Sequence, residues 1–133
     1  TDADEAKRVL SQAKVVVRTN YSNPPTHGAA LVETVLKDPD LKAQWVGELA
    51  GMRDRIKEMR LALVAGLEAE GVSGFGFIAD QVGMFSYSGL TREQMVKLRE
   101  EHHVYGTDAG RICVAALNRG NVGYVSKAVA AVL

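Results

Sequence analysis

The stretch from Leu41 to Leu67 reads LKAQWVGELAGMRDRIKEMRLALVAGL. Large apolar residues recur in it at steps of three or four, over roughly seven turns of helix. They are Leu41, Trp45, Leu49, Met52, Ile56, Met59, Leu63 and Leu67. The pattern predicts one long helix of about 40 Å, at 1.5 Å per residue. A small domain rarely needs such a helix, so we expect it to link two bodies of a larger protein.

Two shorter helices are predicted before this stretch. Residues 2–17 carry an apolar stripe at helical spacing, with acidic residues at the start that complement the helix dipole. The pair Pro24-Pro25 interrupts the helical pattern, and Thr26 can cap a second helix through Leu36. The basic residues Arg53, Arg55, Lys57 and Arg60 alternate with acidic ones and indicate a solvated face of the long helix.

An α/β layer is predicted after the long helix. Residues 75–79 and 84–88 have the composition of two short strands in a hairpin. Thr91 and Gln94 form a capping-box pattern that predicts a helix from Arg92 to His102. A strand over residues 112–117 and a helix whose stripe is Val122, Val125, Val129 and Val132 complete a β-β-α-β-α order.

Composition excludes several classes of protein. With 16 Lys plus Arg against 16 Asp plus Glu, the chain has no excess positive charge to attract nucleic acid. No apolar run reaches the roughly 20 residues needed to span a membrane. Cys113 is the only cysteine, so no internal disulfide can form, and we expect it to be a small buried apolar residue in a cytoplasmic protein. His102 and His103 point about 100° apart on a helix, so we expect no metal site.

Three motifs then point to a family. They are Arg18-Thr-Asn-Tyr-Ser-Asn-Pro-Pro25 followed by His27-Gly28, Gly83-Met-Phe-Ser-Tyr-Ser-Gly-Leu90, and Tyr105 through Gly110-Arg-Ile-Cys-Val-Ala115. In order and spacing they resemble the aspartate/aromatic aminotransferases, which are fold-type I pyridoxal phosphate enzymes. The resemblance covers essentially the whole chain.

The resemblance implies an α/β fold class, the C-terminal portion of a pyridoxal phosphate-dependent transferase. Residues 1–40 would be helices of the large cofactor domain, residues 41–70 the interdomain helix, and residues 71–133 the small substrate-closing domain. The family binds pyridoxal 5'-phosphate, exchanges amino groups between amino acids and 2-oxo acids in ping-pong fashion, and forms homodimers. Substrates would be aromatic or acidic. No lysine of this chain lies in the family's cofactor-lysine context, so the chain alone is predicted to be inactive, and no residue here is assigned a catalytic or cofactor-binding role.

Four substrate-binding residues follow from the resemblance. Arg111 matches the arginine that binds the substrate α-carboxylate, for which a planar guanidinium fork is suited. Arg18 matches the arginine that reaches the distal carboxylate in the partner subunit's site, although spacing alone favours a helix C-terminal arginine complementing the dipole. Phe85 and Ser22 would lie close to substrate, and their simpler roles are a strand core aromatic and local turn bonding.

The alternative hypothesis is a stand-alone, non-catalytic α/β module that binds a carboxylate ligand or a protein through the long amphipathic helix. The first methionine of the chain is Met52 and its first residue is Thr1. We expect from this that the sequence continues upstream of Thr1, which favours the aminotransferase.

Overall fold

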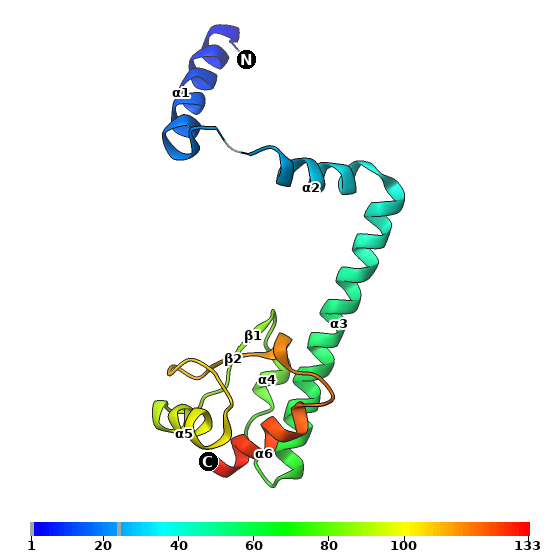
Figure 1. Cartoon of the computed structure of the whole chain (residues 1–133), viewed down its shortest axis with the longest axis vertical. Helices are drawn as coiled ribbons and strands as arrows, with labels where there is room; N and C mark the ends of the chain where they lie inside the picture. The colour runs from blue at the N-terminus through cyan, green and yellow to red at the C-terminus, as the bar shows by residue number, and fades with distance from the viewer. Residues whose placement is uncertain (1, 24) are drawn as a thin grey trace. The chain divides into compact units, whose positions relative to one another are not determined.

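The structure is a computed structural model that describes residues 2–23 and 25–133. Its elements, in chain order, are α1 (Ala3–Tyr21), α2 (His27–Lys37), α3 (Pro39–Ala69), α4 (Phe77–Asp80), β1 (Phe85–Tyr87), α5 (Arg92–His102), β2 (Arg111–Cys113), the 3-10 helix η1 (Val114–Ala116) and α6 (Val122–Val132) (Figure 1). Contacts divide the chain into two compact units, the first ending at Val46 and the second spanning Gly47–Leu133.

Helix α1 runs four residues beyond its predicted end at Val17. Asp2 caps it by accepting the amide of Asp4 at 2.9 Å, and the hydroxyl of Thr19 bonds back to carbonyls of the preceding turn. The Thr19 side chain therefore bonds within the helix, which continues past Val17. The chain leaves the helix at Ser22, whose φ of 59° is the left-handed region. Of the predicted proline pair, Pro24 lies outside the described residues, as does Thr1.

The predicted cap of α2 by the Thr26 side chain is wrong. Thr26 already has a helical backbone conformation and its hydroxyl makes no capping hydrogen bond. A capping residue needs an extended backbone to aim its side chain at the free amides of the first turn. No described side chain of α1 or α2 is buried. Their apolar residues are instead exposed, including Val9, Leu10, Val16, Leu31, Val32 and Leu36.

The predicted long helix is confirmed as α3, which is 31 residues long. It begins two residues earlier than predicted, because the Asp38 carboxylate accepts the amides of Asp40 and Leu41 while Pro39 occupies the first turn. At the far end Gly71 takes a φ of 80°, and the amide of Val72 bonds to the carbonyl of Leu67 at 3.0 Å. This glycine closure ends the helix.

The hydrophobic core lies in the second unit. Its buried members are Met59, Leu63, Leu67, Ile78, Leu90, Met95, Leu98, Val114, Leu117, Ala128, Val129 and Val132. Only the C-terminal part of α3 contributes, and α6 lies beside that part (Figure 1). Gly66 permits the approach, since a Cβ there would stand 2.3 Å from the hydroxyl oxygen of Ser126. The predicted bounds of α5 and the Thr91–Gln94 capping box are confirmed, and the four valines of the predicted last helix all lie in α6.

The predicted hairpin is wrong. Residues 77–80 form the one-turn helix α4, which buries Ile78, and β1 pairs antiparallel with the distant β2. The 112–117 strand prediction is also wrong beyond Cys113, where the chain turns into η1. Apolar composition does not separate a short strand from a buried turn of helix, and a strand needs a partner to bond its backbone. The observed order after α3 is thus α-β-α-β-η-α.

The prediction of a solvated face on the long helix is wrong at Arg60, which is buried. Its side chain is 2% exposed, and its guanidinium donates to the carbonyls of Ile78, Gly83 and Phe85 and to the Ser86 hydroxyl at 2.7–3.2 Å. Arg55, on the same helix, donates to the carbonyls of Ala115 and Leu117. Charge patterning could not show this, because most of the acceptors are backbone carbonyls and all of them are remote in sequence.

Candidate functional site

The β1–β2 ladder brings Arg111 and Phe85 together. Tyr87 pairs with Arg111 and Phe85 with Cys113, so Phe85 and Arg111 lie on the same face of the sheet. The Cζ atom of Arg111 lies 5.0 Å from the centroid of the Phe85 ring, in a cation–π contact. Both side chains are exposed. Within residues 2–23 and 25–133, the Arg111 guanidinium has no hydrogen bond or ion pair, so its donors are available to a ligand carboxylate.

The backbone of Arg111 is fixed by the preceding turn. Its amide donates to the Thr107 hydroxyl at 3.1 Å, and its carbonyl accepts the Thr107 amide at 3.0 Å. Gly110 sits between them with a φ of 80°. The Gly110 carbonyl accepts both the amide and the hydroxyl of Ser88, each at 2.8 Å. These bonds tie the start of β2 to the end of β1.

Replacing Gly110 with alanine is expected to destabilise the protein. The added Cβ would lie 2.8 Å from the Leu90 carbonyl oxygen, and the positive φ alone costs about 1–3 kcal/mol for a residue with a side chain. Urea unfolding would measure the loss. Gly123→Ala is the matched control, because that Cβ meets nothing within 4 Å on a helix. Equal stability of the two variants would contradict this account.

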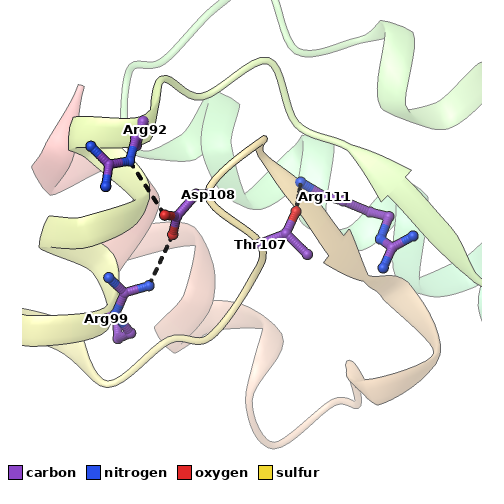
Figure 2. Close-up of polar contacts among 5 residues, drawn as sticks. All are labelled: Arg92, Arg99, Thr107, Asp108 and Arg111. Atoms are coloured by element: carbon purple, nitrogen blue, oxygen red, sulfur yellow. Dashed lines mark hydrogen bonds and ion pairs between the residues drawn. The ribbon is translucent and has the colours of Figure 1, made fainter.

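Asp108 anchors the same turn to α5. Its Oδ1 lies 3.1 Å from Nη1 of Arg99 and its Oδ2 lies 3.3 Å from Nε of Arg92, as Figure 2 shows. The hydrogen bonds from Arg99 and Arg92 hold the pKa of the Asp108 carboxyl below its ordinary value. Sequence reasoning missed this cluster. Its one signal was that Arg92 and Arg99 lie seven residues apart, on one face of a predicted helix.

Arg18 and Ser22 come together in the first unit. They line a groove of about 490 Å³ at the C-terminal end of α1 with Leu10, Ala13, Lys14, Val17 and Asn23. The Ser22 amide donates to the Arg18 carbonyl at 3.0 Å. In the described part of the chain the Arg18 guanidinium, like that of Arg111, has no hydrogen bond or ion pair, so the groove presents an unpaired cation.

A cavity of about 280 Å³ lies in the second unit and is largely apolar. Leu63, Phe75 and Val129 form part of its wall, and His103, Tyr105 and Tyr124 add polar atoms. None of the described residues that line it is Lys or Arg. Pyridoxal phosphate needs donors for its phosphate and an amine for its aldehyde, so this cavity does not fit the cofactor. Cys113 also lines it and is half-buried, not fully buried as predicted.

The sequence pattern of the family described as aminotransferase class I and II matches residues 3–129. The chain belongs to this family. It is 56% identical over 131 residues to an aspartate aminotransferase of Pseudomonas aeruginosa, and 46% identical over 133 residues to one of Escherichia coli K12. These alignments cover 98% and 99% of this chain.

Solved aminotransferases share the fold. An aromatic-amino-acid aminotransferase from Burkholderia pseudomallei, covalently bound to pyridoxal phosphate, superposes with a TM-score of 0.93 at 59% identity and covers 100% of this chain. The match spans 34% of that chain, and 33% and 34% of the two aspartate aminotransferases. The chain thus spans about a third of the length of these relatives. The expected portion of a pyridoxal phosphate-dependent transferase fold is confirmed.

Two further observations bear on the site. In the ranges that the structure describes, no three His, Cys, Asp or Glu side chains are grouped as ligands of one metal ion. None of the described helices combines the length and apolar character that crossing a membrane requires.

Proposed function

We propose that this chain is the substrate-carboxylate-binding portion of a pyridoxal phosphate-dependent aminotransferase. The enzyme would transfer an amino group between an aromatic or acidic amino acid and a 2-oxo acid, as a cytoplasmic homodimer. Family membership supports the activity, and relatives named for both aspartate and aromatic amino acids support the substrate range. Arg111 binds the α-carboxylate of either substrate in this proposal.

The availability of the Arg111 guanidinium carries the proposal. An exposed arginine usually pairs with a neighbouring acid, whereas this one rests on the Phe85 ring and keeps its donors free within the described residues. The ring limits where the guanidinium can move, because the cation is attracted to the aromatic face. A planar fork held in this way suits the two oxygens of a carboxylate. Phe85 then serves as a platform for Arg111 beside the substrate.

Arg18 is proposed to bind the distal carboxylate of a dicarboxylic substrate in the partner subunit's site, with Ser22 lining it. The free guanidinium of Arg18 in its groove supports this role. Helix α1 ends with this arginine in its last turn, where it also complements the dipole. The two roles are compatible, since the guanidinium extends from the helix end. An aromatic substrate needs no such pairing, so Arg18 would govern acidic substrates alone.

We also propose which parts of the chain belong to which domain of the aminotransferase. Residues 1–40 belong to the large cofactor domain, residues 41–70 form the interdomain helix, and residues 71–133 form the small domain that closes on substrate. The lysine and phosphate-binding groups that hold the cofactor belong to the part of the aminotransferase that this chain does not cover. The unsuitable lining of the cavity in the second unit supports this. The chain by itself is therefore inactive.

The test compares the full aminotransferase with the 133-residue chain, each supplied with pyridoxal phosphate. L-aspartate or L-phenylalanine is offered with 2-oxoglutarate, and formation of glutamate is followed. The full protein is expected to turn over with parallel double-reciprocal lines, and the chain alone is expected to form no glutamate. Turnover by the chain alone would refute the placement of the cofactor lysine. Failure of the full protein to transfer an amino group, with succinate still bound, would favour a non-catalytic carboxylate-binding module.

A further inference from the structure

We propose that Asp108 is a positioning residue for Arg111, acting through its two ion pairs to α5. The inference rests on the proposed role of Arg111 in binding the substrate carboxylate. In this proposal four residues together determine the position of the Arg111 guanidinium. They are Arg92, Arg99, Asp108 and Thr107. We refer to the first three as the Asp108 clamp.

The clamp joins a rigid helix to a short turn. Helix α5 is fixed in the core by Met95 and Leu98, which are 1% and 0% exposed. Arg92 and Arg99 extend from this helix toward the same carboxylate, and each takes one of its oxygens (Figure 2). The two contacts together restrain Asp108 along α5, because a shift toward one arginine moves the carboxylate away from the other.

The turn transmits this position to Arg111. Thr107, the neighbour of Asp108, bonds to both the amide and the carbonyl of Arg111. The Thr107 carbonyl also accepts the Gly110 amide at 2.9 Å, which closes the turn. In Figure 2 the Asp108 and Arg111 side chains leave the turn in different directions, so the clamp holds the backbone and leaves the Arg111 guanidinium free.

The competing explanation is a surface ion pair that adds a little stability and nothing else. Isolated exposed pairs contribute little to stability, because solvent screens them and the side chains lose freedom when they pair. The Asp108 clamp differs in geometry, because two cations hold one carboxylate and the Arg99 side chain is only 37% exposed. The lowered pKa of Asp108 shows that the charged form is favoured by both arginines. The two explanations differ in what they predict for ligand affinity.

The experiment uses the full cofactor-loaded aminotransferase with Asp108→Asn, with Arg92→Gln/Arg99→Gln, and with all three changes. Glu100→Gln is the control. It removes one negative charge, as Asp108→Asn does, but from α5, and Glu100 has no hydrogen bond or ion pair in the described residues. Calorimetry measures the dissociation constant of succinate, and steady-state kinetics give KM and kcat. Hydrogen exchange reports the Arg111 amide, and thermal unfolding gives Tm.

Asp108→Asn is expected to raise the succinate dissociation constant and the amino acid KM together, by about three- to tenfold, as for residues coupled in one network. The triple variant should bind succinate as tightly as the double arginine variant. Once both arginines are replaced, Asp108 has no ion pair left to lose. Exchange of the Arg111 amide should quicken in Asp108→Asn, while Glu100→Gln stays within about twofold in every binding measurement.

A lowered Tm with unchanged succinate affinity and unchanged exchange at Arg111 would overturn the inference, as would additive losses in the triple variant. Arg111→Gln separates this from failure of the proposed function. If Arg111→Gln leaves succinate binding intact, the role of Arg111 itself is wrong. If Arg111→Gln weakens binding and Asp108→Asn does not, only the clamp proposal fails.

Discussion

Replacing Arg111 with glutamine in the full aminotransferase is expected to lower kcat/KM for every amino acid substrate on the order of 100-fold, as loss of a bidentate charge-assisted contact does. The guanidinium supplies two parallel donors in one plane, and glutamine supplies one neutral amide. Arg111→Lys should recover only part of the loss, because an ammonium keeps the charge but not the fork. Initial rates with L-aspartate and with L-phenylalanine measure the effect.

Arg119→Gln is the control for this substitution. Arg119 is 85% exposed and pairs with Glu58 at 2.7 Å, so removing it takes away a surface ion pair and no proposed ligand contact. We expect its kcat/KM to stay within about twofold of the unchanged protein. Because both substrates carry an α-carboxylate, Arg111→Gln must impair both. A loss confined to L-aspartate would instead assign Arg111 to the distal carboxylate.

Replacing Arg60 with methionine is expected to cost about 1–3 kcal/mol of unfolding free energy, the range for leaving a buried hydrogen-bond acceptor without its donor. Methionine matches the length of the side chain but cannot donate. The carbonyls of Ile78, Gly83 and Phe85 would lose their bonds to Arg60, of which the bond to Ile78 is buried and the other two are partly buried. Urea unfolding would measure the change. Arg53→Met is the control, because the ion pair of Arg53 with Asp54 is exposed to solvent and adds little to stability.

The Arg60 substitution should also disturb the site. Arg60 donates hydrogen bonds to the Phe85 carbonyl and the Ser86 hydroxyl and so holds β1 in place. Strand β1 carries Phe85 and also Tyr87, which pairs with Arg111 of β2. Burial lowers the pKa of the Arg60 guanidinium by desolvation, and the four acceptors offset this cost. If Arg60→Met unfolded at the same urea concentration as the unchanged protein, the network would have no role in stability.

Local signals in the sequence were enough to predict α3, α5 and α6. The apolar steps of α3, the Thr91–Gln94 capping box of α5 and the valine stripe of α6 each depend on neighbours within one or two turns. These signals lie within one short stretch of sequence, so the bounds of α5 and the position of α6 could be predicted from it. The family motifs around Arg18, Phe85 and Arg111 were likewise contiguous. They indicated the aminotransferase family without any knowledge of the contact between Arg111 and Phe85.

Only the tertiary structure decided the pairing of β1 with β2, the burial of Arg60 and the clamp on Asp108. Each depends on groups 9 to 28 residues apart, and most of the acceptors of Arg60 are carbonyls, which every residue carries. Because every residue has a carbonyl, the sequence does not indicate which carbonyl accepts a hydrogen bond. The sequence around an arginine with acidic neighbours is the same whether its guanidinium faces solvent or binds backbone carbonyls. The sequence by itself determined which family this chain belongs to and where its longer helices lie, but not the short helices α4 and η1. Packing determined which charges are buried, and so how Arg111 is held.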